Sequence, residues 1–452
     1  MQQMSTTANA VAILGLGVTG MSCARYFKSR GRSFVMFDEN PAPQSVMNFE
    51  RDFPQHKLSV GPLQENDLAI FKTIVVSPGI ALDVPAIRRA AVVGANITGD
   101  ITLFKDEAAV PVVAITGSNG KSTVTALVGE MARQAGSNVA VGGNIGKPVL
   151  DLLLDESDYD LYIVELSSYQ LERTAFLAAD AAVVLNLSPD HLDRYANMLA
   201  YQQAKHRIHR GCHYSVFNRA DRLTQPLPTK DTQLVSFGLD APDLKQFGVD
   251  AGFEYLMYGP NKLMPISEMG LQEKHNIENA LAALALGNAV SLPMAAMLVA
   301  ITEFKGLSHR CQFVATVDGV DYINDSKGTN VGATLAAIHG LATGKKDIVL
   351  IAGGVGKGAD FKPLLVASEK LKAVVLIGKS ADELEVVFSS IIRCVRANSM
   401  SDAVEQAAEV AVSGDTVLLS PACASFDMFS SFEHRGEMFV DAVNGLQAEV
   451  LS

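Results

Sequence analysis

Short runs of β-branched and other apolar residues recur along the chain, and each run leads into a glycine-rich or polar turn followed by an amphipathic stretch. This alternation of strand and helix periodicities is typical of parallel α/β layers. It occurs in three consecutive blocks, and the pattern changes near Gly99 and near Gly306. We therefore expect three α/β domains, over residues 1–99, 100–306 and 307–452.

The apolar runs predict the strands of each block. In the first block they are 11–14, 34–37, 57–60 and 74–77, and the block closes around 96–99; in the second they are 111–116, 138–141, 161–166, 182–187 and 214–218. In the third, 313–324 is expected to be a hairpin that turns at Asp318-Gly319, followed by strands 347–352, 373–377 and 415–420.

The uncharged stretch from Asn279 to Thr302 has two possible interpretations. Its length would suit a membrane span, but Gly287, Asn288 and Pro293 interrupt its middle. Because proline ends or kinks a helix, we expect two short buried helices joined near Pro293.

Composition excludes some classes of protein. With 452 residues, 48% of them hydrophobic and 19% charged, the chain should fold throughout and bury large cores. The net charge of −12 disfavours nucleic acid and anionic membrane surfaces as partners. The five cysteines are scattered and the segment from Met1 to Ala10 lacks the features of an export signal, so we expect reduced thiols and a cytoplasmic protein.

The first candidate for chemistry follows an apolar strand and opens a helix. It contains the residues Gly117, Ser118, Asn119, Gly120, Lys121, Ser122 and Thr123. Glycines let backbone N–H groups approach phosphate oxygens, while Lys121 can reach the β- and γ-phosphates and Ser122 can ligate magnesium. A strict P-loop would have glycine where Ile115 stands, so we interpret this segment as a variant P-loop; the alternative is a glycine turn with a surface lysine.

Polar residues follow the next strands of the same block. Glu165 ends one strand, where a carboxylate lies beside the P-loop and can bind magnesium. His191 stands in the sequence SPDHLDRY after another strand, and its two flanking aspartates favour a metal role. Lys205 lies in the helical stretch 197–210, where the residue chemistry alone favours a solvated lysine.

The first block opens with Gly15-Leu16-Gly17-Val18-Thr19-Gly20 after a strand, a full G-x-G-x-x-G. Asp38 ends the following strand, 18 positions after Gly20. Taken alone, this pair is typical of a Rossmann-like dinucleotide site with the acid on a ribose hydroxyl. An NAD-dependent oxidoreductase is therefore one alternative, although it does not explain the P-loop.

Further polar groups stand at a helix start and at strand ends of the third block. Asn276 and Asn279 are three residues apart, so they share a helix face and can pair with an adenine edge. The third block contains the sequences SHR, NDSKGTN, GGVGKG and SPACASFD at loop positions where open α/β sheets place ligands.

In this order the motifs resemble the Mur ligases, the ATP-dependent amide-forming enzymes of peptidoglycan precursor synthesis. The resemblance covers the whole chain and rests on GLGVTG, ITGSNGKST, GGNIG, ELSSYQLE, SPDHLDRY, HNIEN, HR, NDSKGTN, GGVGKGADF and SPACASFD. It implies an N-terminal Rossmann-like domain that binds a UDP substrate, a central P-loop ATPase-like domain and a C-terminal Rossmann-like domain. The first domain and the CASFDMFSSFEHRG ending are most similar to the members that add D-glutamate to UDP-N-acetylmuramoyl-L-alanine.

The resemblance also implies roles for individual residues. For the UDP substrate they are Gly17, Val18, Thr19, Asp38, Ser77, Gly79, Asn144 and His191. For ATP they are the loop Gly117–Thr123 with Asn276, Asn279, Arg310, Asp325 and Lys327, and for D-glutamate they are Thr329, Lys357, Ser425, Phe426 and Phe432. Two magnesium ions would be held by Ser122, Glu165, His191 and a Lys205 carbamylated by carbon dioxide, so that Lys121, Glu165, His191 and Lys205 form the catalytic set. One departure is Val355, where the family pattern often has an acid.

Three alternatives remain beside a monomeric D-glutamate ligase. A related ligase, such as the folate polyglutamylating enzymes, would use another amino acid, but it is not expected to carry this first domain. The oxidoreductase leaves the third domain unexplained. A non-enzymatic nucleotide switch would not turn over ATP in response to an amino acid.

Overall fold

The computed structural model describes residues 10–342, 344 and 346–450. The prediction that the segment from Met1 to Ala10 is not an export signal therefore falls almost wholly outside the described residues. Packing groups the chain into two compact units. The first unit is Met1–Asn186, Gln202–Met269 and Glu278–Glu303, and the second unit is Leu187–Tyr201, Gly270–Ile277 and Phe304–Ser452.

The first sheet lies in the first unit and is parallel throughout, in the order β3-β2-β1-β4-β5. Its elements are β1 (Val11–Leu14), α2 (Val18–Ser29), β2 (Phe34–Asp38), α3 (Pro43–Asp52), β3 (Lys57–Val60), β4 (Thr73–Val76), α4 (Pro85–Val92) and β5 (Asn96–Thr98). This is the order of a Rossmann-like half, and ligands of such sheets bind where the strand order reverses, here between β1 and β4. The four predicted strands of the first block are confirmed, whereas β5, where the block was expected to close, was not predicted as a strand.

The second sheet has the order β14-β13-β12-β11-β10-β9-β6-β8-β7 and also lies in the first unit. Its strands are β6 (Val112–Thr116), β7 (Val139–Gly143), β8 (Leu161–Glu165), β9 (Ala181–Val184), β10 (Tyr214–Asn218), β11 (Gln233–Phe237), β12 (Phe247–Val249), β13 (Tyr255–Tyr258) and β14 (Asn261–Pro265). The strands from β7 to β12 along this order are parallel, whereas β12, β13 and β14 form an antiparallel extension. The hydrophobic pattern predicted the first five strands and missed β11 to β14.

The helical elements of this part are mostly short. They are α5 (Asp100–Glu107), α6 (Lys121–Gln134), α7 (Val149–Leu152), α8 (Ser168–Glu172), α9 (Met198–His206), α10 (Lys274–Ala289) and α11 (Met294–Glu303), with 3-10 turns η1 (Arg207–His209), η2 (Arg222–Thr224) and η3 (Ile266–Glu268). The uncharged stretch forms α10 and α11, which separate around Pro293, so the two-helix interpretation is confirmed. Among the described residues, no helix combines the length and the apolar character needed to cross a bilayer.

The third sheet lies in the second unit in the order β15-β16-β20-β17-β18-β19. Its elements are β15 (Gln312–Val317), β16 (Val320–Asn324), α12 (Val331–Leu341), β17 (Ile348–Gly353), η4 (Lys362–Ala367), β18 (Leu371–Ile377), α13 (Ala381–Phe388), β19 (Arg393–Arg396), α14 (Met400–Val410), β20 (Thr416–Leu419) and α15 (Phe432–Val450). The expected hairpin is present as the antiparallel pair β15 and β16, and the other strands are parallel. The strand β19 was not predicted.

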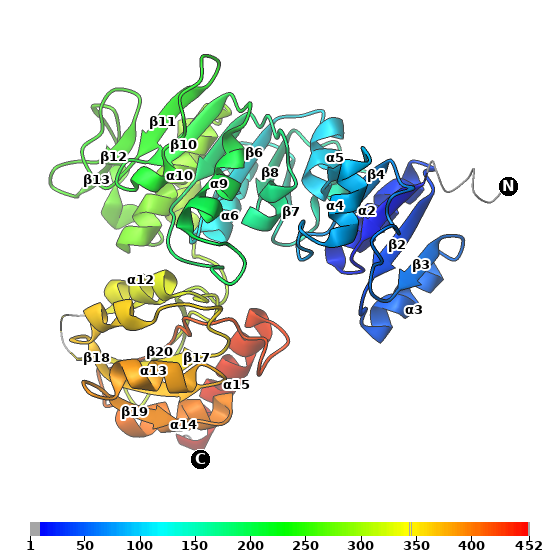
Figure 1. Ribbon diagram of the computed structural model, residues 1–452. Helices are drawn as coiled ribbons and strands as arrows, with labels where there is room; N and C mark the ends of the chain where they lie inside the picture. Colours follow the sequence, from blue (N-terminus) through cyan, green and yellow to red (C-terminus); the bar gives the residue numbers. More distant parts are fainter. Residues whose placement is uncertain (1–9, 343, 345, 451–452) are drawn as a thin grey trace. The chain divides into compact units, whose positions relative to one another are not determined.

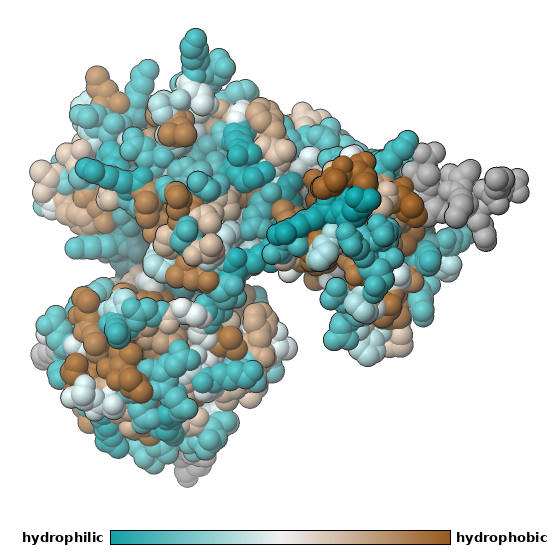
Figure 2. Space-filling view, viewed as in Figure 1, coloured by the Kyte–Doolittle hydropathy of each residue, from teal (hydrophilic) through white to brown (hydrophobic). Residues whose placement is uncertain are grey.

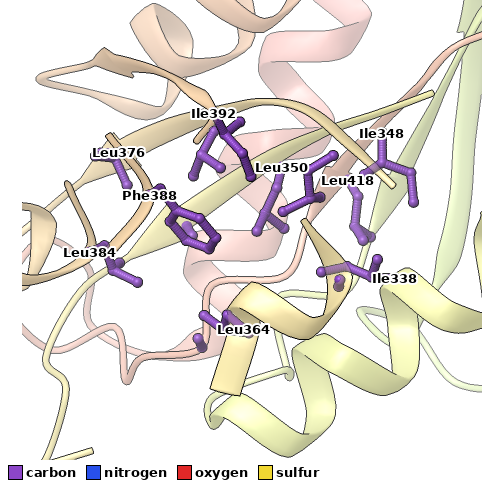
Figure 3. Close-up of a cluster of buried hydrophobic side chains, with 14 of the residues drawn as sticks. Ile338, Ile348, Leu350, Leu364, Leu376, Leu384, Phe388, Ile392 and Leu418 are labelled. Carbon is purple, nitrogen blue, oxygen red and sulfur yellow. The ribbon is translucent and has the colours of Figure 1, made fainter. Parts of the chain in front are cut away.

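Helices cover both faces of the third sheet (Figure 1). On one face, Ile338 of α12, Leu364 of η4 and Phe388 of α13 pack against Leu350 and other strand residues (Figure 3). On the other face, α14 and α15 supply residues such as Val404 and Phe439. Strands buried on both sides explain why the third block shows continuous apolar runs and no alternation.

The surface in view in Figure 2 is largely hydrophilic or mixed, with hydrophobic residues in small separate groups. Single exposed apolar side chains are normal in soluble folds and need no special role. All five cysteines lie in the described residues and are free, with Cys23, Cys212 and Cys423 buried. The expectation of unpaired thiols is therefore met in this structure.

Candidate active site

The first glycine loop joins β1 to α2 at the switch point of the first sheet. Gly15 has φ +96°, and its N–H donates to the carbonyl of Phe37 at 2.7 Å. A Cβ on Gly20 would overlap the carbonyl oxygen of Gly15, whereas Gly17 has open space around it. Gly17 is the N-cap of α2, so the exposed first turn of this helix presents free N–H groups to a ligand.

Asp38 holds this loop from the neighbouring strand. Its Oδ2 accepts the N–H of Leu16 at 2.6 Å, and its Oδ1 accepts the N–H of Asn40 at 3.0 Å. Ser77, after β4, packs on the same loop, and its Oγ donates to the carbonyl of Gly15 at 3.4 Å. The structure therefore brings together Asp38, Ser77 and the glycine loop, as the sequence predicted, and gives Asp38 an additional role in shaping the loop.

The variant P-loop joins β6 to α6, which begins at Lys121. Gly117 and Gly120 have φ +157° and +80°, conformations that side chains with a Cβ rarely adopt. The Nζ of Lys121 donates to the carbonyls of Gly117 and Ser118 at 2.9 and 2.8 Å. The lysine thus folds back over the loop, which places its charge where the phosphates of a nucleotide would lie.

Asn186 braces this loop, and the sequence analysis assigned it no role. Its Oδ1 accepts the N–H of Asn119 at 2.8 Å, its Nδ2 donates to the carbonyl of Asn119 at 3.1 Å, and its own carbonyl accepts the N–H of Ser118 at 2.9 Å. Asn279 of α10 lies on the other side, because a Cβ on Gly120 would be 2.5 Å from its Oδ1. The only available signal for Asn186 was its position just after a buried strand.

Glu165 ends β8, which pairs directly with β6 and places Glu165 opposite Ile115. The carboxylate is 1% exposed; Oε1 accepts the Nδ2 of Asn144 at 2.9 Å, while Oε2 is buried and has no hydrogen-bond partner. A buried carboxylate oxygen without a donor is costly unless a cation or donor joins it. The carboxylate of Glu165, at this edge of the sheet, therefore fits a hard divalent cation, which prefers oxygen ligands.

Lys205 is 2% exposed, so the solvated-lysine interpretation of its helix is wrong. Its Nζ donates to the carbonyl of Gly117 at 2.9 Å and approaches Oγ1 of Thr116 at 3.4 Å. The helix α9 carries this lysine under the P-loop, where its amine meets the end of β6. The side chain thus packs against the P-loop and not on the surface.

His191 lies in the second unit with φ +56°, beside Asp190. The Nε2 of His191 is 3.6 Å from Oδ2 of Asp190. Asp190 also accepts from Lys357 at 2.6 Å and from Asn330 at 3.3 Å. The sequence placed Asp190 and Asn330 in candidate motifs but predicted no role of their own for them. In the described residues, no group of three or more His, Cys, Asp or Glu side chains is arranged to hold a metal ion.

Asp325 is buried at the end of β16, where its Oδ2 accepts Ser420 Oγ at 2.7 Å and its Oδ1 accepts the N–H of Cys311 at 3.3 Å. Burial raises the pKa of Asp325 to about 6, against the opposing influence of Ser420 and of the positive charge of Arg310. The Nζ of Lys327 lies over the ring of Phe432, 3.6 Å from its centroid. The predicted residues of this loop are therefore held by contacts within the second unit.

The remaining predicted residues of the second unit differ in exposure. Ser425 is 2% exposed and Phe426 is 76% exposed, while Thr329 is half-buried. Arg435, which the sequence analysis did not single out, is fully buried and donates to Ser326 Oγ, to the carbonyl of Ser326 and to the carbonyl of Cys423. Burial lowers the pKa of Arg435 to about 10. This guanidinium ties the start of α15 to two loops of the site.

The second sheet carries a P-loop beside a buried acid, and the first and third sheets of the chain are α/β sheets of the Rossmann-like kind. This combination is typical of three-part α/β nucleotide-binding proteins. Family models match all three parts: "Mur ligase MurD-like, N-terminal domain" at residues 9–99, "Mur ligase middle domain" at 115–287 and "Mur ligase, glutamate ligase domain" at 309–423. The chain belongs to the Mur ligase family.

Relatives extend over almost the whole chain. A UDP-N-acetylmuramoylalanine–D-glutamate ligase of Pseudomonas fluorescens is 50% identical over 438 residues, covering 96% of this chain and 97% of the relative. The enzyme of the same name from Legionella pneumophila is 48% identical, with 96% and 98% covered.

Solved structures agree on the fold. MurF from Acinetobacter baumannii matches with TM-score 0.61 and 15% identity over 98% of each chain. UDP-N-acetylmuramate-alanine ligase MurC from Thermotoga maritima matches with TM-score 0.59 and 19% identity, covering 96% of this chain and 99% of that one. The MurF ligase of the same organism, in complex with ADP, matches with TM-score 0.58 and 15% identity.

Proposed function

We propose that this chain is an ATP-dependent ligase that adds D-glutamate to UDP-N-acetylmuramoyl-L-alanine in peptidoglycan precursor synthesis. The observation that carries the proposal is 50% identity over 96% of the chain to an enzyme named for this reaction. The match to the MurD-like N-terminal model also separates it from ligases that lack a UDP-binding first domain. On this proposal, residues 1–99 bind the UDP substrate, 100–306 bind ATP and magnesium, and 307–452 bind the amino acid.

The P-loop would hold the phosphates of ATP. Backbone N–H groups from Gly117 to Thr123 and the Nζ of Lys121 supply the donors, and Asn186 keeps the loop in shape. Asn276 and Asn279 of α10 would contact adenine, with Arg310, Asp325 and Lys327 contributing from the second unit. The contacts of Asn279 with the P-loop support this assignment.

Magnesium would be held by Ser122, Glu165, His191 and Lys205, in two sites. Bound there, it would neutralise the charge of the transferring phosphate. The orphaned Oε2 of Glu165 supports the acidic part of this set. The burial of Lys205 against the P-loop supports its place in this set, where a carbamate would supply anionic oxygens to a hard cation.

The UDP substrate would bind at the switch point of the first sheet. Gly17, Val18 and Thr19 lie at the N-terminus of α2, Asp38 and Ser77 flank the loop, and Gly79 follows Ser77. Asn144, which is bonded to Glu165, and His191 would contact the sugar–peptide end of the substrate. The residues proposed for D-glutamate are Thr329, Lys357, Ser425, Phe426 and Phe432. At the departure from the family pattern, the backbone of Val355 pairs with Ala424 at 2.8 and 2.9 Å and needs no side-chain carboxylate.

The chemistry follows from these positions. The carboxylate of the alanyl group attacks the γ-phosphate of ATP, which gives an acyl phosphate and ADP. The amine of D-glutamate then attacks the acyl carbon, the tetrahedral intermediate collapses, and inorganic phosphate leaves. The protein contributes orientation and charge neutralisation, since phosphoryl transfer needs little covalent help.

One assay tests the proposal. We expect phosphate release that requires both UDP-N-acetylmuramoyl-L-alanine and D-glutamate, measured across a panel of D- and L-amino acids. Preference for another amino acid would indicate a related ligase, and release independent of any amino acid would indicate a nucleotide switch. For the carbamate, Lys205→Ala should lose activity and recover part of it with short carboxylates; full activity without rescue would exclude the carbamate. We also expect the protein to be cytoplasmic and monomeric. Sedimentation of the purified protein would test the monomeric state.

A further inference from the structure

The carboxylate of Asp190 lies in the second unit between two donors from the C-terminal part of the chain. Its Oδ1 accepts the Nζ of Lys357 at 2.6 Å, and its Oδ2 accepts the Nδ2 of Asn330 at 3.3 Å. The side chains of Asp190 and Lys357 are 8% and 16% exposed. One cation and one amide thus bind the two oxygens of one carboxylate, a geometry that suits any carboxylate that reaches it.

The orientation of Asn330 is fixed by its helix. It is the N-cap of α12, and its Oδ1 accepts the N–H of Ala333 at 2.9 Å. The amide nitrogen must therefore face away from the helix, toward Asp190. The positive end of the α12 dipole lies beside this donor and adds attraction for an anion.

Both sides of this contact have unusual backbone conformations. Lys357 has φ +52° and His191, next to Asp190, has φ +56°. Non-glycine residues in the left-handed region cost free energy and persist where surrounding contacts hold them, often at functional sites. Lys357 stands between Gly356 and Gly358 after β17, so its loop can change conformation more readily than the sheet.

We infer that Lys357 and Asn330 form a carboxylate subsite that Asp190 occupies before the amino acid binds and that a carboxylate of D-glutamate takes over. This inference rests on the proposed function for the identity of the incoming carboxylate. Asn330 thereby becomes a substrate-binding residue, and Asp190 becomes a positioning residue that competes with the substrate. Because Asp190 competes for Lys357 and Asn330, the KM for D-glutamate is higher than it would be without this aspartate.

The sign of one kinetic change tests the competition. In Asp190→Asn the competing charge is absent, so the KM for D-glutamate should fall about three- to tenfold while the KM for ATP stays unchanged. Asp193→Asn, the matched control, removes an exposed carboxylate from the same segment and should leave both constants unchanged. If Asp190 only orients Lys357, the KM for D-glutamate rises or stays the same, and that result overturns the inference.

A second measurement does not depend on turnover. In the substrate-free protein, the rate at which an amine-acylating reagent modifies Lys357, followed by mass spectrometry, should rise at least about threefold in Asp190→Asn, because an ion-paired, half-buried ammonium is protected. Asn330→Ala should raise the KM for D-glutamate and leave that for ATP unchanged. An unchanged acylation rate overturns the bridge itself. If phosphate release by the wild-type enzyme does not depend on D-glutamate, while Asp190→Asn still raises the acylation rate of Lys357, the proposed function is contradicted and the ion pair between Asp190 and Lys357 is established.

Discussion

The glycine loop after β1 and the P-loop after β6 both connect a buried parallel strand to the N-terminus of a helix. They differ in the side chains around them. The first helical turn after Gly17 contains no charged residue, and the carboxylate of Asp38 on the adjacent strand accepts a hydrogen bond from the N–H of Leu16 in the loop. The P-loop begins its helix with Lys121, and Glu165 lies on the adjacent strand.

The same backbone unit therefore suits two kinds of ligand on the proposed function. Free N–H groups at a helix start attract any anionic group, but a triphosphate also needs a cation close to its terminal phosphate. A carboxylate beside the loop suits the hydroxyl groups of a sugar and repels additional phosphate charge. The neighbouring side chains, and not the glycine spacing, therefore distinguish the loop proposed for the UDP substrate from the loop proposed for ATP.

The largest expected effect is at the cation of the P-loop. Lys121→Ala should lower turnover about a hundredfold to a thousandfold, since loss of a main charge stabiliser commonly costs roughly 3–4 kcal/mol. ADP release in the presence of both co-substrates measures it, with the exposed Lys230→Ala as control. If Lys121→Ala keeps more than about a tenth of the wild-type rate of ADP release, the charge of Lys121 does not distinguish the function of the P-loop from that of the first loop.

Within the first loop, two glycines should respond differently. Gly20→Ala places a Cβ onto the carbonyl of Gly15 and should destabilise the protein by about 1–3 kcal/mol. Gly17→Ala meets open space and should leave stability nearly unchanged. Chemical denaturation of the two variants makes the comparison. Equal free energies of unfolding for the two variants would show that the backbone around Gly20 shifts to accommodate the added Cβ at no cost.

Asp38 gives the next effect in size. Asp38→Asn weakens two backbone hydrogen bonds to a charged acceptor, so the KM for the UDP substrate should rise about tenfold. The KM for ATP should stay constant, because the P-loop is unaffected. The exposed neighbour Glu39→Gln is the control. A parallel rise in both constants would mean that the two loops are not independent.

The smallest expected change concerns the brace of the P-loop. Asn186→Ala removes two hydrogen bonds to Asn119 and should raise the KM for ATP about three- to tenfold, with the KM for the UDP substrate constant. Asn261→Ala on the exposed end of the same sheet should change neither. Unaltered ATP binding in Asn186→Ala would show that the glycines alone shape the loop.

Much of the core fold followed from local patterns, because central parallel strands are buried on both faces and appear as continuous apolar runs. The strands β5, β11 to β14 and β19 were not predicted. Gln233 and Leu234 of β11 are exposed, and so are Asn261 and Lys262 of the edge strand β14, so neither strand has a continuous buried apolar run. The partner strand, not the residue pattern, keeps them extended.

The sequence by itself determined the order of strands, glycine loops and helices, the lysine of the P-loop, and the family. These are local features, fixed by glycine conformations, helix starts and buried strand runs. Only the tertiary structure decided that Lys205 is buried beneath the P-loop, that Asn186 braces it, and that Asp190 bonds to Lys357. Such contacts join residues far apart in the chain, and their energies depend on burial and distance, which no local pattern specifies.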